Sequence, residues 1–182
     1  MSSEAPLRAV FFDRDGVLNA DHGYVHDPAR LEWIPGAREA VAALTAAGIA
    51  CIVVTNQSGV ARGYFAEEAV HVLHAFMREE FGRSGGRIAA FYHCPFHKDA
   101  VDAAYRHDDH PDRKPNPGMI LRGLAEQGLS AVECVLVGDN DSDVEAARRA
   151  GVEGFLFTGG NLQDFLKAKL GPRFPTASGD AA

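Results

Sequence analysis

The apolar and polar positions of this chain follow two alternating patterns. Short apolar runs rich in β-branched and aromatic residues are typical of buried strands in a parallel sheet; they cover residues 8–12, 49–54, 87–93, 134–137 and 153–157. Between them, apolar residues recur at helical spacing, which predicts helices from Pro35-Gly36 to Gly48 and over 67–81, 117–124 and 142–150. Strands that alternate with helices predict the α/β class, with a doubly wound, Rossmann-like parallel sheet and right-handed crossovers.

The length of 182 residues is sufficient for one domain with a sizeable core. We expect this domain to span residues 1–170, with a polar loop over 19–33 and an irregular loop insertion at about 94–116. The last dozen residues, 171–182, are expected to form a flexible tail.

Charge and cysteine content restrict the partners. The formal net charge of -7 argues against a nucleic-acid backbone as the main partner, but it leaves a small phosphorylated substrate open. Three cysteines form no disulfide framework, and no signal peptide or membrane-length apolar run is present. The expectation is a cytoplasmic protein without a membrane partner, with a monomer as the default.

Two aspartates, Asp13 and Asp15, directly follow the first apolar run. Residues i and i+2 of an extended chain face the same way, so both carboxylates are expected at the carboxyl end of the strand, where open α/β sheets bind ligands. Close carboxylates repel unless a cation joins them or one is protonated. Gly16 allows the sharp turn that follows. The alternative interpretation, for the two aspartates alone, is a strand that ends in a solvated acidic turn.

The second apolar run leads into T-N-Q-S-G-V-A-R-G, which begins at Thr55. A threonine hydroxyl and backbone N–H groups in such a loop suit phosphate oxygens. Further candidate substrate-binding residues are Asn56, Gln57, Ser58 and Arg62, the last because a guanidinium fork matches phosphate geometry. The alternative is an ordinary turn between strand and helix.

Two later strand ends carry more chemistry. Lys114 lies just before a predicted helix, and Pro115 and Pro117 restrict the backbone around it. A lysine there can neutralise a transferring phosphoryl group. The alternative is a solvated surface lysine. Asp139 follows the fourth strand and a glycine and is the better metal ligand there, and Asp143 could orient a metal-bound water. We expect Asp141 or Ser142 to cap the following helix.

The order of these groups along the chain resembles the haloacid dehalogenase superfamily of phosphohydrolases, whose four motifs are all present. The resemblance implies a core of that type, with Asp13 as the nucleophile and Asp15 as general acid and then base. It also implies that Thr55 and Lys114 bind the phosphoryl group. Mg²⁺ would be held by Asp13, the backbone carbonyl of Asp15, and Asp139.

A narrower resemblance rests on D-R-D-G-V-L-N, G-Y-V-x-D-P, T-N-Q-S-G-V-A-R-G, C-P-x-H, R-K-P-x-P-G-M and V-G-D-x-x-x-D. These strings are similar to those of the D-glycero-D-manno-heptose 1,7-bisphosphate phosphatases, with histidinol-phosphate phosphatases as close relatives. The resemblance implies a minimal cap, removal of the C7 phosphate, and sugar-phosphate contacts from Asn19, Arg62 and Arg113. Tyr24 is expected to rim the pocket.

The chain departs from this family at a loop where members often bind a structural zinc through cysteines and histidine. Phe96 stands in a histidine position, and His110-Pro111-Asp112 replaces a cysteine pair. The residues that remain to bind zinc are Cys94, His97, His110 and Asp112. Because two thiolates are lost, we expect no zinc there and a loop shaped by packing of Tyr92, Phe96 and Tyr105. Asn140 stands where relatives often have lysine.

Other functional classes remain open at this stage. A generalist sugar-phosphate phosphatase would use the same motifs. A signalling receiver domain also combines Asp, Thr and Lys, but it carries the phosphorylated Asp on a middle strand. A 2-haloacid dehalogenase does not need Asp15, and a phosphomutase normally needs a helical cap that excludes water.

Overall fold

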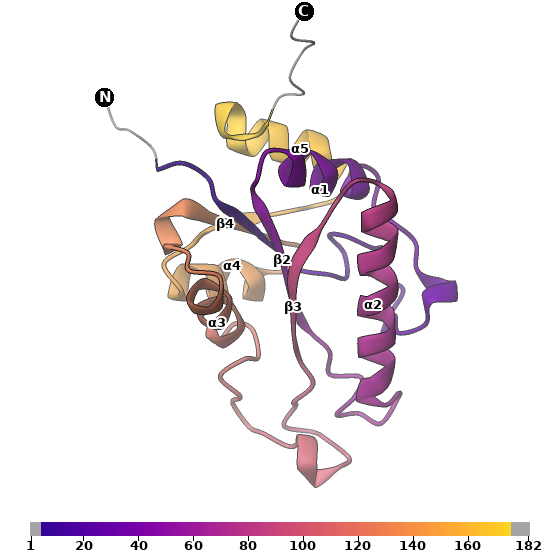
Figure 1. Cartoon of the computed structure of the whole chain (residues 1–182). Coiled ribbons are helices and arrows are strands. Elements are labelled where there is room, and N and C mark those ends of the chain that lie inside the picture. Colours follow the sequence, from indigo (N-terminus) through magenta and orange to yellow (C-terminus); the bar gives the residue numbers. More distant parts are fainter. Residues whose placement is uncertain (1–4, 176–182) are drawn as a thin grey trace, which may run out of the picture.

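The computed structural model describes residues 5–175 and contains one five-stranded, fully parallel sheet (Figure 1). Its strand order is β3-β2-β1-β4-β5. The strands are β1 (Ala9–Phe12), β2 (Ala50–Asn56), β3 (Ile88–Cys94), β4 (Cys134–Gly138) and β5 (Glu153–Leu156). The predicted α/β class and all five predicted strands are confirmed, with ends that move by no more than two residues.

Helices cover both faces of the sheet. They are α1 (Ala37–Ala46), α2 (Glu67–Arg83), α3 (Gly118–Glu126), α4 (Asp141–Arg149) and α5 (Leu162–Leu170). One core lies between the sheet and α1, α2 and α5, and the other lies between the sheet and α3 and α4. The fold is therefore the doubly wound, three-layer arrangement that the alternating pattern predicts.

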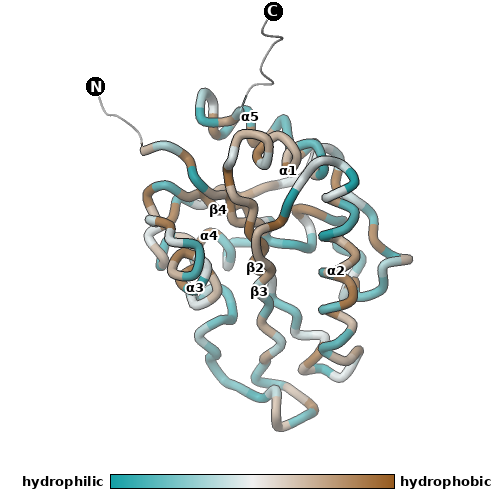
Figure 2. The backbone as a smooth tube through the Cα atoms, viewed as in Figure 1, coloured by the Kyte–Doolittle hydropathy of each residue, from teal (hydrophilic) through white to brown (hydrophobic). Residues whose placement is uncertain are grey.

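The central strand is buried on both faces. Val10 and Phe12 enter the core on the side of α1, and Ala9 and Phe11 enter the core on the side of α3. Figure 2 shows the strands as a hydrophobic centre, with the hydrophilic positions on the helices and loops around it. A central parallel strand therefore reads as an unbroken apolar run, because neither of its faces meets water.

Strand register brings the polar strand ends together. Phe12 is aligned with Val53 of β2 on one side and with Val137 of β4 on the other. The residues that follow these three positions therefore emerge at the same edge of the sheet. This edge carries Asp13, Thr55 and Asp139.

Helix α5 is absent from the sequence prediction. It begins after Asn161, whose side chain accepts a hydrogen bond from the Asp164 N–H, and it buries Leu162, Leu166 and Leu170 against α1. Its apolar residues are less sharply separated onto one face than those of α3 and α4, which have the same length, and this weakens the helical pattern. The four-residue spacing of the leucines and the capping asparagine are the signals that could have revealed it.

The predicted tail is wrong at its beginning. Gly171–Arg173 forms a short 3₁₀ helix, and Phe174 is buried in the core under α5. Residues 176–182, the remainder of the predicted tail, lie outside the described residues.

Two irregular segments flank the functional edge of the sheet. The polar loop over 19–33 contains a single 3₁₀ turn at Pro28–Arg30, and the insertion after β3 contains one at Ala103–Tyr105. The insertion extends away from the sheet beyond the end of β3 (Figure 1). Within residues 5–175, no helix is long and apolar enough to cross a membrane.

The packing of α5 predicts a specific loss of stability. Leu166 is fully buried, so Leu166→Ala should lower the free energy of unfolding by about 2–5 kcal/mol through lost burial and a residual cavity. The matched control is Leu121→Ala, because Leu121 is 48% exposed on α3 and should change stability by less than about 1 kcal/mol. Urea unfolding measures both. Equal effects would contradict the packing of α5 against the core.

Candidate active site

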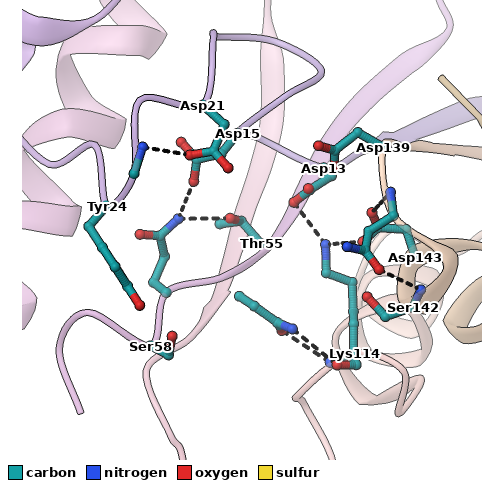
Figure 3. Close-up of a pocket in the computed structure, with 14 residues that line it drawn as sticks. Asp13, Asp15, Asp21, Tyr24, Thr55, Ser58, Lys114, Asp139, Ser142 and Asp143 are labelled. Atoms are coloured by element: carbon teal, nitrogen blue, oxygen red, sulfur yellow. Dashed lines mark hydrogen bonds and ion pairs between the residues drawn. The ribbon is translucent and has the colours of Figure 1, made fainter. Parts of the chain in front are cut away.

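Lys114 is the centre of the polar cluster at the edge of the sheet. Its Nζ lies 2.8 Å from Asp13 Oδ1 and 2.6 Å from Asp143 Oδ1, and it donates to the Val54 carbonyl oxygen at 2.8 Å. Lys114 and Asp143 are almost completely buried. A buried ammonium requires such partners, so the lysine joins the ends of β1 and β2 to the start of α4 and is not the solvated side chain of the alternative interpretation (Figure 3).

Burial changes the protonation of this cluster. It raises the pKa of Asp13 from 3.8 to about 7, against the attraction of the Lys114 ammonium, and Asp143 adds to the increase. Burial and the charge of Asp143 likewise raise the pKa of Asp139. The two carboxylates beside Lys114 outweigh burial and keep the pKa of its ammonium above the usual value. The carboxylates therefore carry more negative charge than one lysine neutralises.

Asp13, Asp139 and Asp143 could hold a metal ion, because one carboxylate oxygen from each lies within 4.8 Å of the others. Glycines permit this approach. A Cβ at Gly16 would lie 2.0 Å from Asp139 Oδ2, and one at Gly138 would lie 2.1 Å from the Asp143 Cβ. Hard oxygen ligands of this kind suit Mg²⁺.

Asp143 is less suited than Asp13 and Asp139 to bind the metal directly, because both of its carboxylate oxygens already have partners. Its Oδ1 faces Lys114, and its Oδ2 accepts the Asn140 N–H as part of a capping box at the start of α4. The cap of α4 is therefore Asn140, and the prediction of Asp141 or Ser142 is wrong. Asn140 has the better position because its side chain accepts the N–H of Ser142, the second residue of the helix.

Asp15 is held by a second network beside Asp13. Its carboxylate accepts hydrogen bonds from Arg14, from Asn19 Nδ2 at 2.9 Å and from Gln57 Nε2 at 2.9 Å. Gln57 also donates to Thr55 Oγ1 at 2.9 Å, so one amide orients both side chains (Figure 3).

Arg14 is a structural part of the site that the sequence analysis missed. It is fully buried, its Nη2 donates to both oxygens of Asp15 and to the Val25 carbonyl oxygen, and its Nη1 lies 3.3 Å from His74 Nε2. Burial, followed by the charge of Arg14, lowers the pKa of His74 to about 2, so the imidazole is neutral and accepts from the guanidinium. In the sequence, Arg14 is only a polar residue between two aspartates.

Asparagine side chains near the ends of β1 and β2 hold other parts of the site. Asn56 makes reciprocal hydrogen bonds with the backbone of Lys114, through Nδ2 to the carbonyl oxygen and through Oδ1 from the N–H, both at 3.0 Å. Asn19 is fully buried between Asp15 and the Ala20 carbonyl oxygen. The substrate contacts expected of Asn19, Asn56 and Gln57 stay predictions, while their side-chain amides serve to position Asp15 and Lys114.

The site opens into a cleft of about 400 Å³. It is lined by Asp13, Asp15, Asp21, Gly23, Tyr24, Thr55, Asn56, Gln57, Ser58, Lys114, Asp139, Asn140, Ser142 and Asp143. Tyr24 lies at the rim, as expected. Asp21 and Ser142 were missed because nothing in a polar loop or a helix start distinguishes a cleft residue from a solvated one.

Arg62 and Arg113 lie outside the residues that line this cleft but near each other. Burial lowers the pKa of Arg113, and the neighbouring Arg62 adds to this effect. Arg62 Nη2 lies 3.2 Å from His97 Nε2, and its buried Nε has no hydrogen-bond partner among residues 5–175. Neither guanidinium forms an ion pair with a carboxylate among residues 5–175, so the two form a positive region.

The four residues weighed for zinc are not all brought together. Cys94 Sγ lies 4.0 Å from His110 Nδ1, whereas His97 faces Arg62 and Asp112 pairs with Arg122. Phe96 stacks on His110 with ring centroids 4.1 Å apart. The expected packing anchors Tyr92 and Tyr105 also donate hydrogen bonds, to Glu126 and Glu67 respectively.

The burial of Arg14 leads to a prediction about stability. Arg14→Met removes the guanidinium that pairs with Asp15 and donates to the Val25 carbonyl oxygen, and it should lower the free energy of unfolding by about 3 kcal/mol. The same substitution at Arg83, an exposed partner of Glu79 on α2, should cost less than about 1 kcal/mol. Urea unfolding of both variants tests this, and a fully stable Arg14→Met protein would refute the proposed role of the buried guanidinium.

Comparison with known proteins agrees with this geometry. Residues 20–151 match the haloacid dehalogenase-like hydrolase family. A D-glycero-beta-D-manno-heptose-1,7-bisphosphate 7-phosphatase from Rhodopseudomonas palustris is 44% identical over 172 residues, which cover 93% of this chain and 94% of the relative. A D-glycero-alpha-D-manno-heptose-1,7-bisphosphate 7-phosphatase from Burkholderia mallei is 41% identical over 145 residues, 80% of this chain and 76% of the relative.

A solved structure shows the same likeness. The D,D-heptose 1,7-bisphosphate phosphatase from B. bronchiseptica, determined in complex with magnesium and phosphate, superposes with a TM-score of 0.76 at 32% identity, covering 89% of this chain and 87% of that one. The chain therefore belongs to the haloacid dehalogenase-like hydrolases and, within them, to the family of the D-glycero-D-manno-heptose-1,7-bisphosphate 7-phosphatases.

Proposed function

We propose that this chain is a Mg²⁺-dependent phosphatase that removes the C7 phosphate of D-glycero-D-manno-heptose 1,7-bisphosphate. The observation that carries the proposal is the buried contact of Lys114 with Asp13 at the floor of an open cleft. A carboxylate that faces both a cleft and a fixed cation is suited to attack phosphorus. The names of relatives that share most of the chain's length support the substrate class.

In the first step, an oxygen of Asp13 attacks the phosphorus of the C7 phosphate. The bond between phosphorus and the C7 oxygen breaks, and Asp15 gives its proton to that oxygen. Lys114 and the Thr55 hydroxyl bind oxygens of the transferring group. Mg²⁺ bound by Asp13, Asp139 and the backbone carbonyl of Asp15 supplies charge neutralisation between the carboxylates and the phosphate.

In the second step, water attacks the phosphorus of the aspartyl-phosphate. Asp15 takes a proton from the water, the bond from phosphorus to the Asp13 oxygen breaks, and phosphate leaves. Gln57, Asn19 and Arg14 hold the Asp15 carboxylate through both steps. Asp143 keeps Lys114 aligned with Asp13 through its contact with Nζ.

The second phosphate of the substrate, at C1, suits the positive region formed by Arg62 and Arg113. The unpartnered Nε of Arg62 faces no carboxylate among the described residues, which favours an anionic ligand. His97, whose pKa is lowered by burial and by these two arginines, would contribute as a neutral group. A substrate with two phosphates can occupy the catalytic cluster and this region together.

The cellular setting and the oligomeric state stay predictions. All three cysteines are free and buried, which is consistent with the proposed cytoplasmic location. A monomer is the form in which we propose that the enzyme acts.

The proposal is tested by phosphate release with Mg²⁺ from both heptose 1,7-bisphosphate anomers, histidinol phosphate and fructose 1,6-bisphosphate. A heptose anomer should have the highest kcat/KM. Asp13→Asn should lower kcat by at least about 10³-fold. Asp164→Asn, at an exposed position of α5, should leave it unchanged. Similar rates on all substrates would indicate a generalist phosphatase, and a preference for histidinol phosphate would assign the alternative function.

The proposed C1-phosphate contact predicts a substrate-dependent effect of Arg62. Arg62→Ala should raise KM for the bisphosphate about 10- to 100-fold, because a charge-assisted hydrogen bond is lost. The KM for heptose 7-phosphate should change little, since this substrate lacks the C1 group. Steady-state kinetics with both substrates distinguishes this role from general damage, which would affect both equally.

The raised pKa of Asp13 predicts how Mg²⁺ stabilises the protein. Without metal, the protonated carboxyl favours the folded state, and this contribution is lost as pH rises through about 7. Because Mg²⁺ binds the ionised carboxylate, it should raise Tm more at pH 8 than at pH 5. Asp13→Asn should remove most of this difference. An equal Mg²⁺ effect at both pH values would contradict the proposed ligand.

A further inference from the structure

A second group of metal-binding side chains lies away from the cleft. Glu67 and His71 are one turn apart on the same face of α2. His93 is the second-last residue of strand β3. One ligand atom from each of the three residues lies within 4.8 Å of the others. The sequence analysis did not single out these residues.

The two imidazole rings have an arrangement compatible with one ion. Their centroids lie 5.1 Å apart and their planes are nearly perpendicular, at 82°. Two imidazoles on one tetrahedral Zn²⁺, with Zn–N distances of about 2.0–2.1 Å, bring their ring centroids to about 5 Å of each other. The observed separation therefore needs no movement of the backbone.

The carboxylate is already oriented toward the histidines. Glu67 Oε1 lies 2.6 Å from His93 Nε2, and Tyr105 donates to the other oxygen, Oε2, at 3.0 Å. Metal ligands typically have such a supporting hydrogen bond from a neighbouring group. His74, the next histidine on α2, is engaged with Arg14 and is not available as a ligand.

We propose that Glu67, His71 and His93 form a second metal site, which binds Zn²⁺ or a similar divalent transition ion through two imidazole nitrogens and one carboxylate oxygen. Imidazole favours such ions over Mg²⁺, which prefers the all-oxygen cluster of Asp13 and Asp139. Water completes the coordination, because His71 is exposed and Glu67 is partly exposed.

Metal at this position would connect elements that flank the active site. His93 is the sheet partner of Thr55, and Tyr105 belongs to the insertion that leads to Arg113 and Lys114. The ion would join the start of α2 to the end of β3 and, through Tyr105, to this insertion. Its expected effect is a higher Tm that does not depend on Mg²⁺.

The test is a Zn²⁺ titration of the tag-free, metal-stripped full chain in excess Mg²⁺, by calorimetry with elemental analysis of the bound metal. We expect one Zn²⁺ per chain. His71→Ala, at an exposed helix position, should weaken binding more than tenfold, and Tyr105→Phe should weaken it about tenfold. The matched control is His22→Ala, because His22 and Glu32 form a similar pair, 2.7 Å apart, that belongs to no three-residue metal-binding group among residues 5–175. The His22→Ala protein should bind Zn²⁺ with the same affinity as the wild type.

Several results would overturn the proposal. They are the absence of Zn²⁺ binding by wild type, unchanged binding by both His71→Ala and His93→Gln, or loss of binding in Cys94→Ser with none in His71→Ala. Circular dichroism checks that each variant is folded. Because bound metal is measured without turnover, the outcome is independent of whether the proposed phosphatase activity is correct.

Discussion

The arrangement of the active site depends on one buried ammonium group. Lys114 Nζ contacts two carboxylates and a backbone carbonyl, and it is the group that joins the ends of β1 and β2 to the start of α4. Without these partners, burial of the charge would be strongly unfavourable. With Asp139 included, three carboxylates share one lysine, so the cluster has a net charge of -2 when all three are ionised, and a divalent cation would favour that state.

The surrounding residues act by fixing this group and its neighbours. Asn56 binds both backbone groups of Lys114, and Gly16 and Gly138 leave the space that two carboxylates occupy. Arg14 and Gln57 fix the Asp15 carboxylate by donating hydrogen bonds to it. The side chains proposed to be catalytic are thus held by hydrogen bonds and packing before any substrate binds, and such preorganisation is a major source of catalytic power.

The sequence predicts the framework well because periodicity and strand ends are local signals. An apolar run that ends at Asp13, or at Gly138 and Asp139, is visible in a few residues. The partner of Asn56 is 58 residues away, and the buried state of Arg14 depends on His74 and Val25, so neither can be inferred locally. Helix α5 was missed because its apolar face is weakly defined in the sequence and becomes evident from its packing against α1. Tertiary contacts, not propensity, decided each of these cases.

In the proposed mechanism, Asp13 carries the phosphoryl group during turnover. The test uses the wild-type protein, in which both steps proceed, mixed in excess with substrate radiolabelled in the C7 phosphate and sampled during a single turnover. Rapid acid quench followed by borohydride reduction and mass spectrometry locates any acyl phosphate. The account predicts label on the protein and conversion of Asp13, and of no other residue, to homoserine. Phosphate release without protein-bound label, or label on a different residue, would contradict it.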